Sequence, residues 1–146
     1  MKRIWCFVTA VFLIVLVCTG CSEKDSKTVK ADLPYGEDIG DGFMYLIDAS
    51  GTTKDGEVLR VLLNKDTIMT QIGLNTFSFD GSCFSFIYVD GVFSDKQPLS
   101  DSQFSLTLQG DMLSEGEHTV SVVQYKDNTE SGEIVTYKEA IYAAVY

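Results

Sequence analysis

From about residue 42 to the C-terminus, the sequence predicts an all-β fold, a β-sandwich of seven to eight strands. Short runs of alternating apolar and polar residues recur there, and Gly, Asp and Asn separate them. Such alternation is typical of strands with one buried face, and strands at short intervals with turn signals between them favour a sandwich or a barrel. No stretch after the first 21 residues carries an apolar stripe at helical spacing over three turns.

Eight runs are expected to form the strands. Asp80-Gly81 favours a type I′ hairpin turn, and Asp90-Gly91 ends a run of alternating aromatic residues. The nine Phe, seven Tyr and one Trp lie mostly in these runs and can fill a core. The expected strands cover residues 43–47, 57–64, 67–72, 77–79, 83–89, 104–109, 118–125 and 134–146.

The first 20 residues have the pattern of a secretory signal. Lys2 and Arg3 form a basic start, residues 4–17 form an apolar run without charge, and the chain turns polar directly after Cys21. A positive tip, a short apolar core and small residues before a cleavage site are the parts of a signal peptide. A retained membrane helix is the alternative, but it needs roughly 20 apolar residues, and this run is shorter.

The ending Thr19-Gly20-Cys21 resembles the lipobox of bacterial lipoproteins. The resemblance implies cleavage between Gly20 and Cys21 and transfer of a diacylglycerol to the Cys21 thiol. The protein would then be lipid-anchored at the cell membrane and face outside the cytoplasm, since two acyl chains give a stable anchor. The pattern departs from the family at Cys18, where an aliphatic residue is usual. A plain secretory signal remains an alternative, because Cys18 and Gly20 are both small.

Residues 21–41 are expected to form a flexible tether with the lipidated Cys21 at its start. Residues 22–32 offer almost nothing to bury, and such a composition favours disorder. Turn-forming residues continue this segment up to Gly42. The predicted organisation is a signal helix at residues 1–20, the tether at 21–41 and the sandwich domain at 42–146.

One spacing supports a particular kind of sandwich. A run that ends in Val89-Asp90-Gly91 is followed later by Leu113-x-x-Gly116-x-His118-x-Val120. This combination resembles bacterial immunoglobulin-like extracellular modules, and seven or eight strands in about 105 residues fit an immunoglobulin-like sandwich. The resemblance implies that Leu113 closes one end of the sandwich, that Gly116 forms the corner, and that His118 opens a late strand.

Charge and cysteine content exclude several classes of function. The chain has 11 basic and 21 acidic residues, and removal of Lys2 and Arg3 with the signal would leave a net charge of −12. Such a charge argues against nucleic acid as a partner. Of the four cysteines, two lie in the signal and Cys21 would be lipidated, so Cys83 would be alone. An intramolecular disulfide and a cysteine metal site are therefore not expected in the mature chain.

No catalytic constellation is expected. His118 is the only histidine, no Ser or Cys nucleophile stands near it in sequence, and a corner histidine bonded to the backbone is the favoured interpretation. Cys83 lies in an aromatic run without a cationic neighbour, which favours a small buried apolar side chain over a thiolate. The protein is thus expected not to be an enzyme and to need no cofactor.

A calcium site is the one metal site considered. The acidic clusters supply hard oxygen ligands, but no Asp-x-Asp-x-Asp-Gly loop occurs, and solvated turn formers are the simpler interpretation. No metal ligand is therefore assigned. The residues concerned are Glu37, Asp38, Asp41, Asp90, Asp95 and Asp101.

Three functions remain open. The first is a non-catalytic binding or interaction module at the cell surface, with an envelope protein or a glycan as its ligand. The second is a surface protein of a mobile element that excludes phage or mating. In the third, the signal peptide itself yields a short apolar pheromone, since residues 13–20 resemble such peptides in length and composition.

Overall fold

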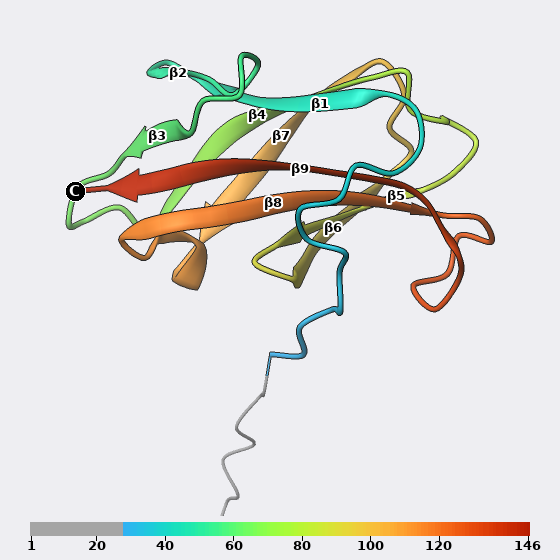
Figure 1. Cartoon of the computed structure of the whole chain (residues 1–146). Helices are drawn as coiled ribbons and strands as arrows, with labels where there is room; N and C mark the ends of the chain where they lie inside the picture. The colour runs from blue at the N-terminus through green and yellow to red at the C-terminus, as the bar shows by residue number, and fades with distance from the viewer. Residues whose placement is uncertain (1–27) are drawn as a thin grey trace, which may run out of the picture.

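The computed structural model describes residues 28–146, which form a sandwich of two β-sheets (Figure 1). The prediction of an all-β sandwich is confirmed. The signal peptide, the cleavage site and Cys21 lie outside the described residues. Within residues 28–146, no helix is long and apolar enough to cross a membrane.

The first sheet has four strands in the order β2-β1-β4-β7, and all its pairs are antiparallel. Leu46 of β1 pairs with Leu74 of β4, which pairs with Phe104 of β7. The bounds are β1 Phe43–Asp48, β2 Gly51–Thr52, β4 Met69–Phe77 and β7 Ser102–Gln109.

The second sheet has five strands in the order β3-β9-β8-β5-β6. Only the β3–β9 pair is parallel, and the early chain therefore contributes β1 to one sheet and β3 to the other. Thus β4 pairs with β7 in one sheet, while β5, β8 and β9 pair in the other. The bounds are β3 Leu59–Leu62, β5 Ser85–Val89, β6 Val92–Gln97, β8 Gly116–Tyr125 and β9 Ile134–Val145, with a 3₁₀ turn, η1, at Gly110–Leu113.

Alternate residues of each strand fill the space between the sheets, as the period of two requires. Leu46, Leu74 and Leu106 from the first sheet meet Ile87 and Val122 from the second, and all five are buried. Leu113 is part of this core, as the resemblance to immunoglobulin-like modules implied. The residues between the core positions point to the two outer faces, which is where the sheets differ.

The strands differ in detail from those expected. Two predicted runs are one continuous strand, β4, because Gly73 and Asn75 do not interrupt it. Gly73 fits there because a Cβ at that position would lie 2.7 Å from Cγ2 of Ile47 on the neighbouring strand. The structure also adds β2 and β6, which gives nine strands in the part of the chain that the structure describes. Asp80-Gly81 does not close a hairpin, because β4 and β5 belong to different sheets, whereas Asp90-Gly91 joins the paired strands β5 and β6.

Part of the expected tether packs against the domain. Residues 31–40, here called the strap, lie along the five-stranded sheet before the chain enters β1 (Figure 1, blue). The Ala31 amide donates to the Gly91 carbonyl at 2.8 Å, and Ile39 exchanges two backbone hydrogen bonds with Tyr137. Leu33 is only 6% exposed. A segment with few apolar residues is disordered when those residues find no surface to pack against. Here the five-stranded sheet provides such a surface for the apolar residues of the strap.

Candidate functional site

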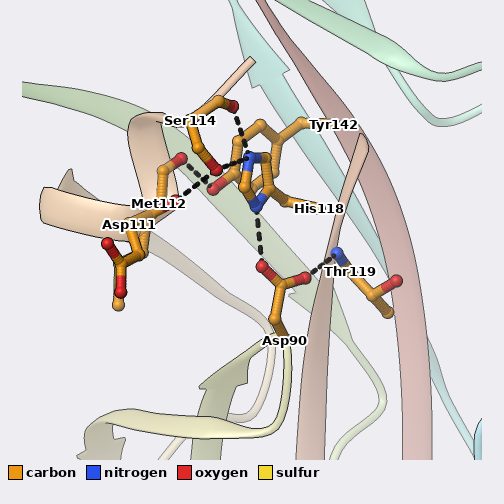
Figure 2. Close-up of polar contacts among 7 residues, drawn as sticks. All are labelled: Asp90, Asp111, Met112, Ser114, His118, Thr119 and Tyr142. Atoms are coloured by element: carbon orange, nitrogen blue, oxygen red, sulfur yellow. Dashed lines mark hydrogen bonds and ion pairs between the residues drawn. The ribbon is translucent and has the colours of Figure 1, made fainter. Parts of the chain in front are cut away.

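The single histidine lies at the corner between η1 and β8, where Figure 2 shows its contacts. His118 is 5% exposed. Its Nδ1 is 2.7 Å from Oδ2 of Asp90, and its Nε2 is 2.7 Å from the carbonyl oxygen of Ser114. The other oxygen of Asp90 accepts the backbone amide of Thr119 at 2.9 Å. The predicted corner histidine bonded to the backbone is therefore present.

Asp90, His118 and Ser114 lie in a line that resembles a catalytic triad in composition only. The Ser114 hydroxyl is 3.5 Å from Nε2 and donates instead to the carbonyl of Asp111 at 2.8 Å. Nε2 lies closer to the carbonyl oxygen of Ser114 than to its hydroxyl, so the contact of the ring is with the backbone. A nucleophile–base pair requires the hydroxyl to donate to the ring nitrogen, and here the hydroxyl donates elsewhere.

Two tyrosines complete this corner. The Tyr142 ring stacks on His118 with a centroid distance of 4.9 Å, and its hydroxyl donates to the carbonyl of Met112 at 2.6 Å. Tyr146 donates to the carbonyl of Leu113 at 2.7 Å. Burial, and then the charge of Asp90, raise the pKa of Tyr142. Three successive backbone carbonyls thus each contact a polar side-chain atom from β8 or from the C-terminal end of the chain. These contacts hold the corner in place.

Cys83 differs from its expected environment. It lies in the loop before β5 rather than inside a strand, and it is partly exposed. Its thiol lies 3.6 Å from Oδ2 of Asp80 and donates to it. Partial burial, and then the charge of Asp80, raise the pKa of the thiol. Hydrogen bonds from Ser82 lower the pKa of the Asp80 carboxyl. A protonated thiol beside a carboxylate is a poor nucleophile.

Four of the six acidic residues considered as calcium ligands contact other groups of the domain. Among residues 28–146, no three His, Cys, Asp or Glu side chains gather closely enough to hold a metal ion. Their carboxylates fix turns and the strap: Asp38 pairs with Lys138, Asp90 with His118, Asp95 accepts the Lys96 amide, and Asp101 accepts the Ser78 amide.

The outer face of the five-stranded sheet carries a set of buried rings, here called the covered cluster. Its members are the residues of β5, β8 and β9 that alternate with core positions, and the strap residue Leu33 lies among them. The Tyr88 hydroxyl donates to Glu130 at 3.1 Å, and Tyr137 donates to Glu139 at 2.7 Å. The members from the sheet are Phe86, Tyr88, Val123, Tyr125 and Tyr137.

The outer face of the four-stranded sheet carries a second set of rings, here called the open stack. Phe43 stacks on Phe77 with a centroid distance of 4.8 Å, and Tyr45 stacks on the same ring at 5.9 Å. Phe43 is 49% exposed, and Ile47 on the same face is also exposed. The Lys54 ammonium lies 5.6 Å from the Tyr45 ring centre. The sequence does not distinguish this site from the covered cluster, because tyrosines and phenylalanines on both faces alternate in the same way.

Comparison with known proteins adds no assignment: no protein family, curated protein or solved structure matches the chain.

Proposed function

We propose that the protein is a membrane-anchored surface lipoprotein whose sandwich acts as a non-catalytic binding module. The open stack carries this proposal. Exposure of large apolar side chains to water is unfavourable relative to their burial. An exposed apolar patch on a soluble domain commonly marks an interaction site. The covered cluster has the same kinds of residue but is packed under the strap, so the open stack is the more accessible of the two clusters.

The strap supports a defined orientation of the head above the membrane. It enters the domain at Gly91, beside Asp90 and His118, and leads toward the opposite end. Ten residues separate a lipidated Cys21 from Ala31, and ten residues span at most about 35 Å. The His118 corner would thus face the membrane. The loops at residues 78–84 and 126–133, joined by the hydrogen bond from the Phe84 amide to Asn128, would face outward.

Mass spectrometry tests the anchor. The full chain, produced in a bacterial host, should yield a mature protein that begins at Cys21 and carries a diacylglycerol. Cys21→Ser should leave the chain uncleaved and unmodified. An unacylated mature N-terminus in the unmutated protein would overturn the anchor.

A sedimentation assay tests the binding module. The full chain, in a zwitterionic detergent without sugar, is mixed with lipid-extracted envelopes of the bacterium that encodes it, and the sedimented fraction is measured. We expect retention of the unmutated chain and at least a tenfold loss for Phe43→Ala/Tyr45→Ala. Ile68→Ala is the matched control, because Ile68 is exposed but lies before β4. Background retention of the unmutated chain would contradict the proposal.

A further inference from the structure

A hollow of about 400 Å³ lies on the outer face of the four-stranded sheet, beside the open stack. Asn75 of β4 pairs with Tyr45 of β1 on one side and with Gln103 of β7 on the other. This volume falls at the lower end of the range of small-molecule sites, about 300–1,000 Å³. The lining residues are Ile47, Gly73, Asn75, Gln103, Phe104 and Ser105.

Gly73 lines the hollow at its centre. It stands between Ile47 of β1 and Ser105 of β7, and all the other outer-face positions of β4 carry a side chain. Ile47 lies over the position that a Cβ at residue 73 would take, and glycine in a strand interior often marks such a close approach. A side chain at residue 73 would therefore displace Ile47 and change the lining of the hollow.

Asn75 supplies an unused hydrogen-bonding group. It is only 5% exposed, it lines the hollow, and its side chain forms no hydrogen bond with any residue in the described part of the chain. Gln71, four residues earlier on the same face, donates to Thr107 at 3.2 Å. The polar atoms of Asn75 are not sealed off from solvent, so they meet water in the hollow, and a ligand there could take the place of that water.

The chemistry of the lining selects the ligand class. None of the six lining residues is ionisable, although the whole chain has a net charge of −10. Carboxamides and a hydroxyl both donate and accept hydrogen bonds, and so do the hydroxyls of a sugar. Ile47 offers an apolar wall to the C–H face of such a ring. A charged ligand would lose its hydration without a counter-charge in this lining.

We propose that the hollow binds one residue of a neutral saccharide, with the carboxamides of Asn75 and Gln103 bonding to its hydroxyls. This proposal rests on the proposed function as a surface binding module and names its ligand class. The open stack lies beside the hollow and provides aromatic surface for a neighbouring residue of the same polymer.

Titration with defined oligosaccharides tests the proposal. The full chain in sugar-free zwitterionic detergent is titrated by calorimetry with neutral hexasaccharides of glucose, galactose, mannose and N-acetylglucosamine, and with hexagalacturonate as a charged probe. We expect saturable binding of at least one neutral hexasaccharide and none of hexagalacturonate. Asn75→Leu, which keeps the volume but removes the amide, should weaken binding at least tenfold. Gln71→Leu is the matched control and should bind as the unmutated chain does.

The outcomes separate this proposal from the proposed function. Should Asn75→Leu not fold, the exposed Gln103→Leu takes its place with the same expectation. Equal binding by Asn75→Leu, Gln103→Leu and the unmutated chain overturns the hollow as the site, as does binding of hexagalacturonate. If no neutral hexasaccharide binds but the envelopes still retain the chain, the saccharide proposal fails and the binding module stands. If the envelopes retain nothing either, both fail.

Discussion

The two outer faces of the sandwich carry similar aromatic residues and yet have opposite environments. On the five-stranded sheet, Tyr88 and Tyr137 are fully buried because the strap lies over them. On the four-stranded sheet, about half of Phe43 is exposed and a hollow opens over Gly73. The comparison shows that the segment before β1, and not the strands themselves, decides which face is free. Substitutions under the strap should therefore lower stability and leave binding unchanged. Substitutions in the open stack should weaken binding and have little effect on stability.

The largest expected difference concerns alkaline pH. Burial raises the pKa of Tyr88, with added effects of Tyr125 and Glu130. Burial also raises the pKa of Tyr137, where the hydrogen bond with Ser121 opposes the shift and Glu139 adds to it. Since unfolded tyrosine ionises near pH 10, the stability from these groups is complete below about pH 10 and is lost as the pH rises further. Each group contributes a slope of about 1.4 kcal/mol per pH unit.

Urea unfolding between about pH 8 and about pH 11 measures this slope. Tyr137→Phe removes one ionisable group from the covered cluster and should reduce the slope by about 1.4 kcal/mol per pH unit. A stability that stays constant across this range would show that the cluster is open to water.

The next largest effect belongs to the strap. Leu33→Ala removes a buried side chain from the covered cluster, and we expect a loss of about 2–3 kcal/mol in the free energy of unfolding, measured in urea. Val29→Ala, at an exposed position just before the strap, should change it by less than about 0.5 kcal/mol. Envelope retention should be unaffected by Leu33→Ala. Equal stability of both variants would contradict a packed strap.

A smaller effect is expected at the ion pair that holds the end of the strap. The Lys138 side chain is 8% exposed and pairs with Asp38, which is 81% exposed, while it also donates to the Gly40 carbonyl at 2.8 Å. Asp38→Asn should cost about 1 kcal/mol, because water screens the exposed carboxylate but the ammonium stays buried.

Adding Lys138→Met to Asp38→Asn should recover part of that loss, since a buried charge without a partner is then absent. The control is the exposed pair of Lys126 and Glu133, where Glu133→Gln should have almost no effect on unfolding. If the double variant is less stable than Asp38→Asn, the Lys138 ammonium stabilises the domain through contacts other than its ion pair with Asp38.

The smallest stability effect is expected on the open face. Phe43→Ala removes a half-exposed ring from the stack on Phe77 and should cost about 0.5–1 kcal/mol, measured by thermal unfolding. The same variant should weaken envelope retention, in contrast to Leu33→Ala. A large loss of stability with unchanged retention would reverse the assignment of the two faces.

Particular residues show which features of the structure could be predicted from the sequence. Alternation placed Ile87 and Val122 in strands, because it is a local pattern, and the resemblance to immunoglobulin-like modules implied the corner with Leu113 and His118. The contact of His118 with Asp90 was not predicted, since 28 residues separate them and the pairing of β5 with β8 brings them together. Alternation ends the predicted run before Gly73, and the close approach of Ile47 that suits a glycine there comes from another strand.

The sequence alone determined the local properties: an all-β chain, acidic, with a single cysteine after residue 21 and a histidine at a corner. These follow from side-chain periodicity and composition, which need no knowledge of distant contacts. Only the tertiary structure decided that the strap covers one sheet and leaves the other open, and that Asn75 lines a hollow without a partner among the described residues. Both depend on which surfaces far apart in the chain meet, and alternation has the same appearance on either face.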